Sequence, residues 1–557
     1  MADNHPAKRI KLSPGSQADT SNDSLESDIQ GLASLRRSVT PPPSRNRSRS
    51  QSHSAPPWSS KEVDESTQKP QVVPSPIQLT HIRDLSAFSG NNVDTVRLRD
   101  ILGDPMIREC WQFNYLHDVD FMLNQFDEDV RRLVRVKVVH GSWKRDAPNR
   151  VRIDEACSRH PNVEAIVAYM PEAFGTHHSK MMILLRHDDL AQVIIHTANM
   201  IPGDWANMCQ AVWRSPLLPL QKTDGGQGDL ELGSGARFKR DLLAYLTEYG
   251  SKKTGPLVDQ LKKHDFRAIR AALVASVPSK QKINSLDSQR KTLWGWPALK
   301  DTIRHISLAQ KSNKNATPHI IIQMSSVASL GQTDKWLKDV LFASLSPQSS
   351  SQHPKYSIIF PTADEIRRSL NGYGSGGSIH MKLQSALQQK QLQYMRPYLR
   401  HWAGDHDAVG LSNTPKQDAG RRRAAPHIKT YIRFSDAEKM DTINWAMVTS
   451  ANLSTQAWGA AVNTTGEVRI CSWEIGVVIW PQLYAEGTET ATMVPCFKQD
   501  VPNTRESGGN NTIADVVVGL RMPYDLPLTP YAAHDTPWCA TATHTEPDWL
   551  GQTWTTG

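Results

Sequence analysis

Apolar and polar positions along most of this chain follow two different spacings. Short apolar runs bounded by turn residues indicate buried strands, and apolar residues three or four positions apart indicate helices. Alternating units of these two kinds are typical of an α/β fold, in which helices cover a sheet. The strand-like runs are Val134 to Val139, Val163 to Tyr169, His319 to Met324 and Tyr356 to Phe360, and helical spacing occurs near 117–126 and 237–249.

This globular pattern begins near residue 80 and restarts near residue 300. Residues 1–80 are rich in Ser, Pro and Asp and poor in large apolar side chains, so they bury too little surface to offset chain entropy. We therefore expect a disordered tail over 1–80, a first domain over 81–300 and a second domain over 301–557. The basic cluster at 8–11 is either a nuclear-import or nucleic-acid patch, or simply a solvated part of the tail.

One pattern of polar residues occurs twice, in segments roughly 250 residues apart. Each copy has a His-x-Lys, an apolar run and then an Asn, with 18 residues between Lys and Asn in the first copy and 22 in the second. A Trp follows each Asn by six positions, at Trp205 and Trp458. Such agreement in type, order and spacing indicates an internal duplication. The repeated residues are His178, Lys180 and Asn199 in the first copy, and His427, Lys429 and Asn452 in the second.

These repeated residues suit the chemistry of a phosphodiester. Residues i and i+2 of a strand face the same way, so the His and Lys of each copy should converge. The lysines and amides can hold phosphate oxygens, while one imidazole attacks phosphorus and the other protonates the leaving oxygen. The chemistry requires no metal or cofactor, and the residues alone do not say which histidine attacks. His177 faces away from His178 on a strand, so we expect it to be structural.

The repeated motifs resemble those of the phospholipase D superfamily, and the surrounding residues are most similar to its tyrosyl-DNA phosphodiesterase branch. Most phospholipase D relatives carry an Asp five positions after the motif Lys, whereas this chain has Leu185 and Phe434 there, which is typical of that branch. The resemblance covers roughly residues 80–557. The segments that carry it include Phe174 to Met182, His196 to Asn199, Ser325 to Val327, Pro426 to Tyr431 and Thr449 to Ser454.

The resemblance implies two similar α-β-α sandwich domains with the active site at their interface. It also implies hydrolysis of the bond between a DNA 3′ end and a tyrosine of a topoisomerase I-derived peptide, and possible action on other 3′ adducts. In this family reading His178 forms a covalent phosphohistidine, His427 is the general acid and base, and a 3′-phosphate remains. The implied setting is DNA repair in the nucleus. Because each half supplies half of the site, a monomer suffices.

Four further residues enter through the same resemblance. Gln210 and Glu474 would orient the two histidines, with no assignment of one to the other, and Glu474 stands among apolar residues where a carboxylate needs a partner. Ser326 and Ser378 would grip DNA phosphates. Ser378 ends a glycine-rich segment at 371–378 that we expect to open a helix and cradle phosphate. That segment formally contains a Gly-x-Gly-x-x-Gly, but it lacks the context of a dinucleotide site.

Composition agrees with a DNA-directed enzyme. The net charge of +8 favours a polyanionic partner, and the six cysteines form no Cys-x-x-Cys. Arg421, Arg422 and Arg423 either face the entrance of the site or form a solvated turn. No apolar run approaches 18 residues, so we expect no membrane segment. Two alternatives remain at this point: another nuclease or lipid enzyme of the superfamily, and a non-catalytic protein that binds DNA ends.

Overall fold

The structure is a computed structural model. It describes residues 70–222, 230–283, 288–289, 291–308, 316–347, 353–403, 417–502 and 514–555. Most of the expected tail, including the basic cluster at 8–11, therefore lies outside the described residues, as do residues 404–416 before the second motif.

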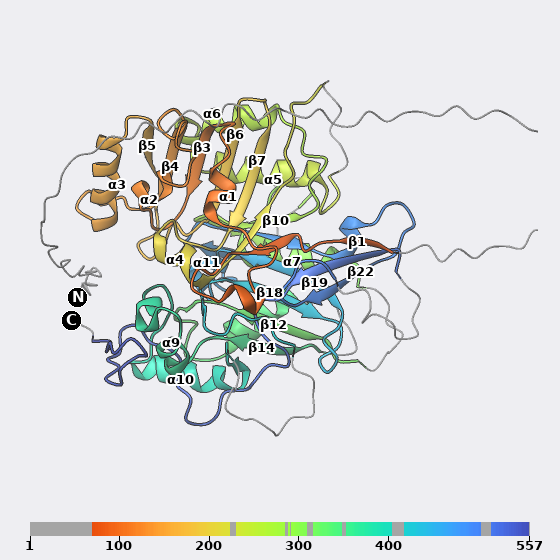
Figure 1. The fold of residues 1–557 in the computed structure, drawn as a ribbon. Coiled ribbons are helices and arrows are strands. Elements are labelled where there is room, and N and C mark those ends of the chain that lie inside the picture. The colour runs from red at the N-terminus through yellow and green to blue at the C-terminus, as the bar shows by residue number, and fades with distance from the viewer. Residues whose placement is uncertain are drawn as a thin grey trace, which may run out of the picture. The chain divides into compact units, whose positions relative to one another are not determined.

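Two large mixed sheets organise the described residues, which confirms the α/β prediction (Figure 1). The seven-stranded sheet has the order β2 (Ile77–Leu79), β9 (Ala211–Arg214), β7 (Ala191–His196), β6 (Met181–Arg186), β3 (Ile107–Phe113), β4 (Arg135–His140) and β5 (Val163–Val167). The main path of the ten-stranded sheet has the order β1 (Gln71–Val73), β23 (Val516–Arg521), β22 (Ala491–Cys496), β19 (Ile443–Thr449), β18 (Thr430–Phe434), β12 (His319–Gln323), β14 (Lys355–Ile359) and β16 (Leu399–Arg400). The other two strands branch from β19, because β21 (Glu474–Ile479) pairs with β19 and β10 (Ala272–Ser276) pairs with β21.

The duplication in the sequence is also a duplication of strand arrangement. The order β9-β7-β6-β3-β4-β5 in the first sheet corresponds to β21-β19-β18-β12-β14-β16 in the second. In both sheets the first three pairings are antiparallel and the last two are parallel. The two His-x-Lys motifs immediately precede β6 and β18, so equivalent strands carry equivalent residues.

Two boundaries expected from the sequence differ in the structure. The segment 70–80 was assigned to the tail, yet β1 pairs with β23, and β2 pairs with β9 with Ile77 and Leu79 buried. Four apolar positions among Ser and Pro are enough for two short strands once long-range partners are present. Likewise, β10 precedes residue 300 but belongs to the ten-stranded sheet. The two sheets therefore do not divide at residue 300, and a domain boundary at that position stays a prediction.

Helices cover the sheets and connect their parallel strands. For example, α3 links the parallel strands β4 and β5. Ser234 caps α5 by accepting the Arg237 N–H, as short polar side chains do at helix starts. The α-helices are α1 (Leu98–Leu102), α2 (Val119–Leu123), α3 (Pro148–Arg159), α4 (Pro202–Ala206), α5 (Gly235–Thr247), α6 (Ser251–Lys262), α7 (Gly295–His305), α8 (Ala343–Leu345), α9 (Ala363–Arg367), α10 (Ala386–Met395) and α11 (Thr455–Trp458). The other described helices are the π-helix η4 (Trp336–Phe342) and the 3-10 helices η2 (Ala87–Ser89), η5 (Gly372–Ser378), η6 (Arg396–Tyr398) and η7 (Pro481–Tyr484).

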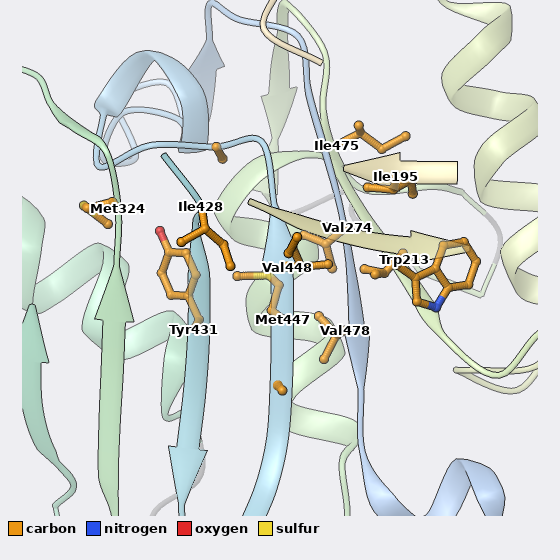
Figure 2. Packing of buried hydrophobic residues seen from close by; sticks show 14 of the residues in the cluster. Ile195, Trp213, Val274, Met324, Ile428, Tyr431, Met447, Val448, Ile475 and Val478 are labelled. Atoms are coloured by element: carbon orange, nitrogen blue, oxygen red, sulfur yellow. The ribbon is translucent and has the colours of Figure 1, made fainter. Parts of the chain in front are cut away.

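One buried apolar cluster extends from the first sheet into the second. Figure 2 shows Ile195 of β7 and Trp213 of β9 near Val448 of β19 and Val478 of β21. Strands buried on both faces are usually continuous apolar runs. β6 is such a run up to Leu185, whereas β18 is buried at every position although it contains Thr430 and Arg433. This shared core holds the starts of β6 and β18 in a fixed relation, which is the requirement for a site built from both halves.

Candidate active site

The two His-x-Lys segments lie just outside their strands. We expected them on strands, but β6 begins at Met181 and β18 at Thr430, each one residue after the motif Lys. The expected convergence nevertheless holds in each copy. The Nζ atom of Lys180 lies 3.1 Å from Nε2 of His178, and Nζ of Lys429 lies 3.2 Å from Nε2 of His427.

Each motif is held by a backbone contact to the opposite half of the chain. In the first, His177 forms a β-bridge with Trp473, and the His178 N–H donates to the Trp473 carbonyl at 2.9 Å. The second motif pairs as β17 (Ala425–Pro426) with β8 (Met208–Cys209), and the Ile428 N–H donates to the Cys209 carbonyl at 2.9 Å. In each case the residue immediately after the bridging partner, Trp473 or Cys209, contacts the catalytic histidine of the other half.

Those following residues are Glu474 and Gln210, the two that were predicted to orient the histidines. Glu474 Oε2 lies 3.0 Å from Nδ1 of His178. Gln210 lies against Nδ1 of His427, with its Nε2 at 3.0 Å and its Oε1 at 3.2 Å. The sequence left open which group contacts which histidine, and the geometry assigns Glu474 to His178 and Gln210 to His427.

The two contacts favour different tautomers. Ionised Glu474 can only accept, so His178 donates from Nδ1 and keeps a lone pair on Nε2. At the other histidine, Thr197 Oγ1 accepts the Ala211 N–H at 2.9 Å and donates to Gln210 Oε1 at 2.8 Å. The Gln210 amide N–H then faces His427 Nδ1, and when that nitrogen accepts, the proton of the neutral ring is on Nε2.

A buried carboxylate, which sequence reasoning missed, joins this second histidine. Asp204 Oδ2 lies 3.2 Å from Nδ1 of His427 and accepts the Asn199 N–H at 2.7 Å. Burial raises the pKa of Asp204, whereas the Asn199 N–H acts in the opposite direction. Asp204 is in α4, five positions after Asn199 and next to Trp205. An acid in a mostly apolar segment was the signal available in the sequence.

The site concentrates positive charge in a buried place. Burial lowers the pKa of Lys180 to about 8, although Glu474 and Asp204 raise it. Burial, followed by the charge of Lys180, holds the pKa of Lys429 well below its usual value. An anion between the two ammonium groups would stabilise their charged forms and relieve their repulsion. The arrangement is therefore matched to a bound oxyanion.

The histidines also have perturbed pKa values. Burial lowers the pKa of His178, and Glu474 partly restores it. Burial, and after it the charge of Lys429, puts the pKa of His427 well below its usual value. Both imidazoles are thus neutral near pH 7 without a ligand. His177, as predicted, is structural, because its ring contacts the Asn114 carbonyl at 3.0 Å and the Tyr249 hydroxyl at 2.9 Å.

The two asparagines have different surroundings. Asn452 Oδ1 accepts the backbone N–H groups of Ser325 and Ser326 at 3.3 and 3.0 Å, and so holds that turn in place. Asn199 Oδ1 is buried and has no hydrogen-bond partner among the described residues. Asn452 therefore already uses its amide oxygen to shape the site.

The two predicted phosphate contacts, Ser326 and Ser378, have different positions. Ser326 begins β13 (Ser326–Val327), which pairs with β15 (His380–Met381). Ser378 ends η5 and donates to Asp204 Oδ1 at 3.4 Å. The expectation that the glycine-rich segment opens a helix was wrong, because the glycines form the 3-10 helix η5 itself, which leads into β15. Gly376 is required there, since a Cβ at this position would meet the Trp538 ring at 2.2 Å.

The arginine run before the second motif is mainly structural. Arg421 is buried and donates to the carbonyls of Thr80 and Asn91. Arg422 pairs with Asp525. Arg423 lies over the Trp549 ring at 5.2 Å. Arg421 therefore fits neither expected alternative, an entrance-facing residue or a solvated turn, because backbone carbonyls take the place of water around its buried guanidinium.

Two broader properties of the described residues bear on the expected chemistry. No group of three or more His, Cys, Asp or Glu side chains in them is arranged to hold a metal ion. No helix among them has both the length and the apolar content that crossing a bilayer requires.

Comparisons with known proteins agree with the residues gathered here. A family model described as tyrosyl-DNA phosphodiesterase matches residues 76–532. The chain is 30% identical to the probable tyrosyl-DNA phosphodiesterase of Schizosaccharomyces pombe, over 87% of this chain and 96% of that protein. It is 30% identical to tyrosyl-DNA phosphodiesterase 1 of Drosophila melanogaster, over 80% and 70%. The yeast tyrosyl-DNA phosphodiesterase crystal structure has the same fold, with a TM-score of 0.57 at 21% identity over 84% of this chain and 99% of that chain.

Proposed function

Because the chain belongs to the tyrosyl-DNA phosphodiesterase family, we propose that it hydrolyses the phosphodiester between a DNA 3′ end and the tyrosine of a topoisomerase I-derived peptide. The observation that carries this proposal is the pair of histidines, each beside its motif lysine and each contacted at Nδ1 by its own partner from the other half. Other 3′ adducts that fit the same phosphate position would also be substrates.

In the first step His178 Nε2 attacks phosphorus and the bond to the tyrosyl oxygen breaks. His427 gives its Nε2 proton to that oxygen, which helps a leaving group whose conjugate acid has a pKa of about 10. The product on the enzyme is a phosphohistidine joined to DNA. Support for this order comes from the lone pair that Glu474 leaves on Nε2 of His178 and the proton that Gln210 leaves on Nε2 of His427.

In the second step His427 acts as base. It takes a proton from water, the resulting hydroxide attacks phosphorus, and His178 departs, which leaves a 3′-phosphate. The carboxylate of Asp204 at 3.2 Å would stabilise the imidazolium that forms on His427. His178 keeps its Nδ1 proton hydrogen-bonded to Glu474 throughout, so it departs through Nε2 as a neutral imidazole.

The remaining site residues bind the phosphate. Lys180 and Lys429 would each neutralise non-bridging oxygens, and the unpartnered Asn199 amide oxygen marks where a donor on the substrate or an ordered water would complete the site. Ser326 and Ser378 stay predicted contacts to phosphates. The reaction requires no metal, a single chain supplies every group, and the expected place of action is the nucleus.

The test is cleavage of a 3′-phosphotyrosyl oligonucleotide in excess chelator by the intact protein, His178→Ala and His177→Ala. We expect full activity in chelator and loss of activity, by a factor on the order of 10⁴ or more, in His178→Ala. His177→Ala, a neighbour that contacts the core, controls for damage to the fold. Tight binding without cleavage by the intact protein would instead favour a protein that only binds DNA ends.

A further inference from the structure

Two buried tyrosines lie beside the segment that carries His178. Tyr245 is in the last turn of α5, and Tyr249 follows two residues after that helix ends. Their rings meet edge to face with centroids 5.6 Å apart, and their hydroxyl groups lie 3.1 Å from each other. Their exposed fractions are 0% and 2%, so neither ring can touch a substrate.

The two hydroxyl groups belong to a chain of hydrogen bonds that contacts both neighbours of His178. Tyr249 Oη lies 2.9 Å from Nε2 of His177, and Tyr245 Oη is hydrogen-bonded to Oγ of Ser179. His177 and Ser179 are the residues immediately before and after the proposed nucleophile. The tyrosine pair therefore holds the backbone on both sides of His178.

Every proton in this chain has one consistent place. The Asn114 backbone carbonyl can only accept, so His177 donates to it from Nδ1 and accepts at Nε2. Burial lowers the pKa of His177 to about 3, so the ring stays neutral and keeps that acceptor. Tyr249 then donates to His177 and accepts from Tyr245, and Tyr245 in turn accepts from Ser179. Because each hydroxyl group uses its single proton once, loss of one leaves a buried partner without a donor.

The same tyrosines contact the segment that carries Glu474. The Tyr249 ring stacks on the Trp473 ring with centroids 3.8 Å apart, and the Tyr245 ring meets Trp473 edge to face at 5.7 Å. Trp473 precedes Glu474, and its carbonyl accepts the His178 N–H at 2.9 Å. The tyrosine pair thus contacts both of the segments whose side chains, His178 and Glu474, meet at 3.0 Å.

We propose that Tyr245 and Tyr249 are positioning residues that hold the His178 ring in line with Glu474, an inference that rests on the proposed function. Because both are buried, neither touches the phosphate or the reacting atoms. Their hydroxyl chain sets the backbone from which His178 projects, and their rings set the segment from which Glu474 projects. A nucleophile must reach phosphorus in line with the leaving oxygen, so a small displacement of His178 lowers the rate of attack steeply.

The two steps of the proposed reaction depend on this positioning to different extents. In adduct formation the free imidazole of His178 must be aimed at phosphorus, so a displaced segment lowers the rate. In adduct hydrolysis the bond from Nε2 to phosphorus already fixes the ring, and His427 activates the water. A defect in the hydroxyl chain should therefore slow the first step and leave the second unchanged. Loss of folded protein would instead lower the amplitude of both steps without changing either rate.

Rapid-mixing kinetics on a 3′-phosphotyrosyl oligonucleotide measure the two steps separately, as the rate at which the adduct forms and the rate at which it disappears. The variants are Tyr249→Phe, Tyr245→Phe and Ser179→Ala, which remove one hydroxyl group and add no volume. The matched control is Tyr356→Phe, because this tyrosine is in β14, which carries neither motif, and its hydroxyl donates to the Phe342 carbonyl at 3.0 Å. Thermal unfolding checks the fold of each variant, and Ser179→Ala, the smallest change, decides the matter if a tyrosine variant fails to fold.

We expect Tyr249→Phe to slow adduct formation on the order of 10-fold, with adduct hydrolysis and the substrate concentration at half-maximal rate unchanged. The pH profile of adduct formation is a second readout. Among the groups that face His178, Glu474 is the one that raises its pKa, so a looser contact should move the acidic limb to lower pH. The charged or titratable groups that face His178 are Glu474, Lys180, Lys429, His427, His177 and Tyr115.

A double variant shows whether the effect passes through Glu474. When Tyr249→Phe and Glu474→Gln are combined, the loss should be smaller than the product of the two single losses, because both act on one contact. His177→Ala removes the end of the same chain. It should lose activity to about the same extent as Tyr249→Phe, well short of the loss in His178→Ala.

Three results would overturn the positioning role while leaving the proposed function intact. In the first, the folded variants Tyr249→Phe, Tyr245→Phe and Ser179→Ala all form the adduct at the rate of the intact protein. In the second, both steps slow equally and the acidic limb stays in place, as a merely structural role would give. In the third, the losses in the double variant multiply in full. Absence of cleavage by the intact protein would instead refute the proposed function itself.

Discussion

Replacing Glu474 with Gln keeps the shape of the site and removes one charge. The side chain is buried, lies 3.0 Å from His178 Nδ1 and also accepts the Ser450 hydroxyl at 2.5 Å. An amide oxygen can still accept from Nδ1, so His178 keeps its tautomer. The neutral amide, however, no longer stabilises the positive charge that develops on the His178 ring as Nε2 bonds to phosphorus. Hydrogen bonds to charged groups contribute about 1.5–3 kcal/mol against about 0.5–1.5 for neutral ones.

The midpoints of these ranges differ by about 1.25 kcal/mol, which corresponds to a loss of about 8-fold in the rate of adduct formation. The pH profile should move as well. Glu474 raises the pKa of His178, so the pKa falls further when the carboxylate is removed. Because His178 attacks as the neutral base, the acidic limb of kcat/KM should shift to lower pH in Glu474→Gln even as the plateau falls.

Single-turnover rates and pH profiles of the intact protein, Glu474→Gln and Glu172→Gln measure both effects. Glu172 is a carboxylate near the same motif that forms an ion pair with Arg469, so its loss controls for a general change of charge. An unchanged plateau, or an acidic limb that shifts to higher pH, would show that Glu474 does not act on His178 in the way described.

Three other predictions concern charge elsewhere in the chain. Lys180→Gln should lower kcat/KM by about 10²–10³, the usual cost of one oxyanion contact, in the same single-turnover assay. Asp204→Asn should slow adduct hydrolysis about 10-fold, since the imidazolium of His427 loses a charged partner, and the covalent adduct should then accumulate on denaturing gels. Burial raises the pKa of Asp500 to about 7, despite the opposing effect of Arg521. The folded state therefore keeps a proton that the unfolded state releases, and the free energy of unfolding should fall as pH rises from about 4 to about 7. Chemical denaturation of Asp500→Asn should show this slope reduced, by on the order of 2 kcal/mol over the range; an unchanged slope would mean that another group titrates there.

The sequence was informative wherever the signal is local or repeated. The two copies of His-x-Lys predicted a convergence of His and Lys that the structure shows in each copy, and the apolar runs predicted the strands behind them. The partnership of Glu474 with His178 could not be read in this way, because it depends on a bridge between His177 and Trp473, nearly 300 residues apart. Local spacing carries no information about such pairing.

Burial of charged groups was the other source of error. Arg421 is in a basic run, which usually indicates a solvated or ligand-facing surface, yet two backbone carbonyls from residues 80 and 91 compensate its burial. Asp204 was overlooked for a similar reason, since its carboxylate belongs to the site through contacts with Asn199 and His427 that no short motif encodes. In both cases tertiary partners decide whether a charge can be buried.

The central claim is that His178, and not His427, carries the covalent intermediate. The direct measurement is peptide mapping, by mass spectrometry at neutral to alkaline pH, of the protein–DNA adduct trapped by His427→Ala with a 3′-phosphotyrosyl oligonucleotide. The account predicts that the phosphorylated residue is His178 and that the double variant His178→Ala, His427→Ala forms no adduct. An adduct on any other residue, or one that persists in the double variant, would contradict it.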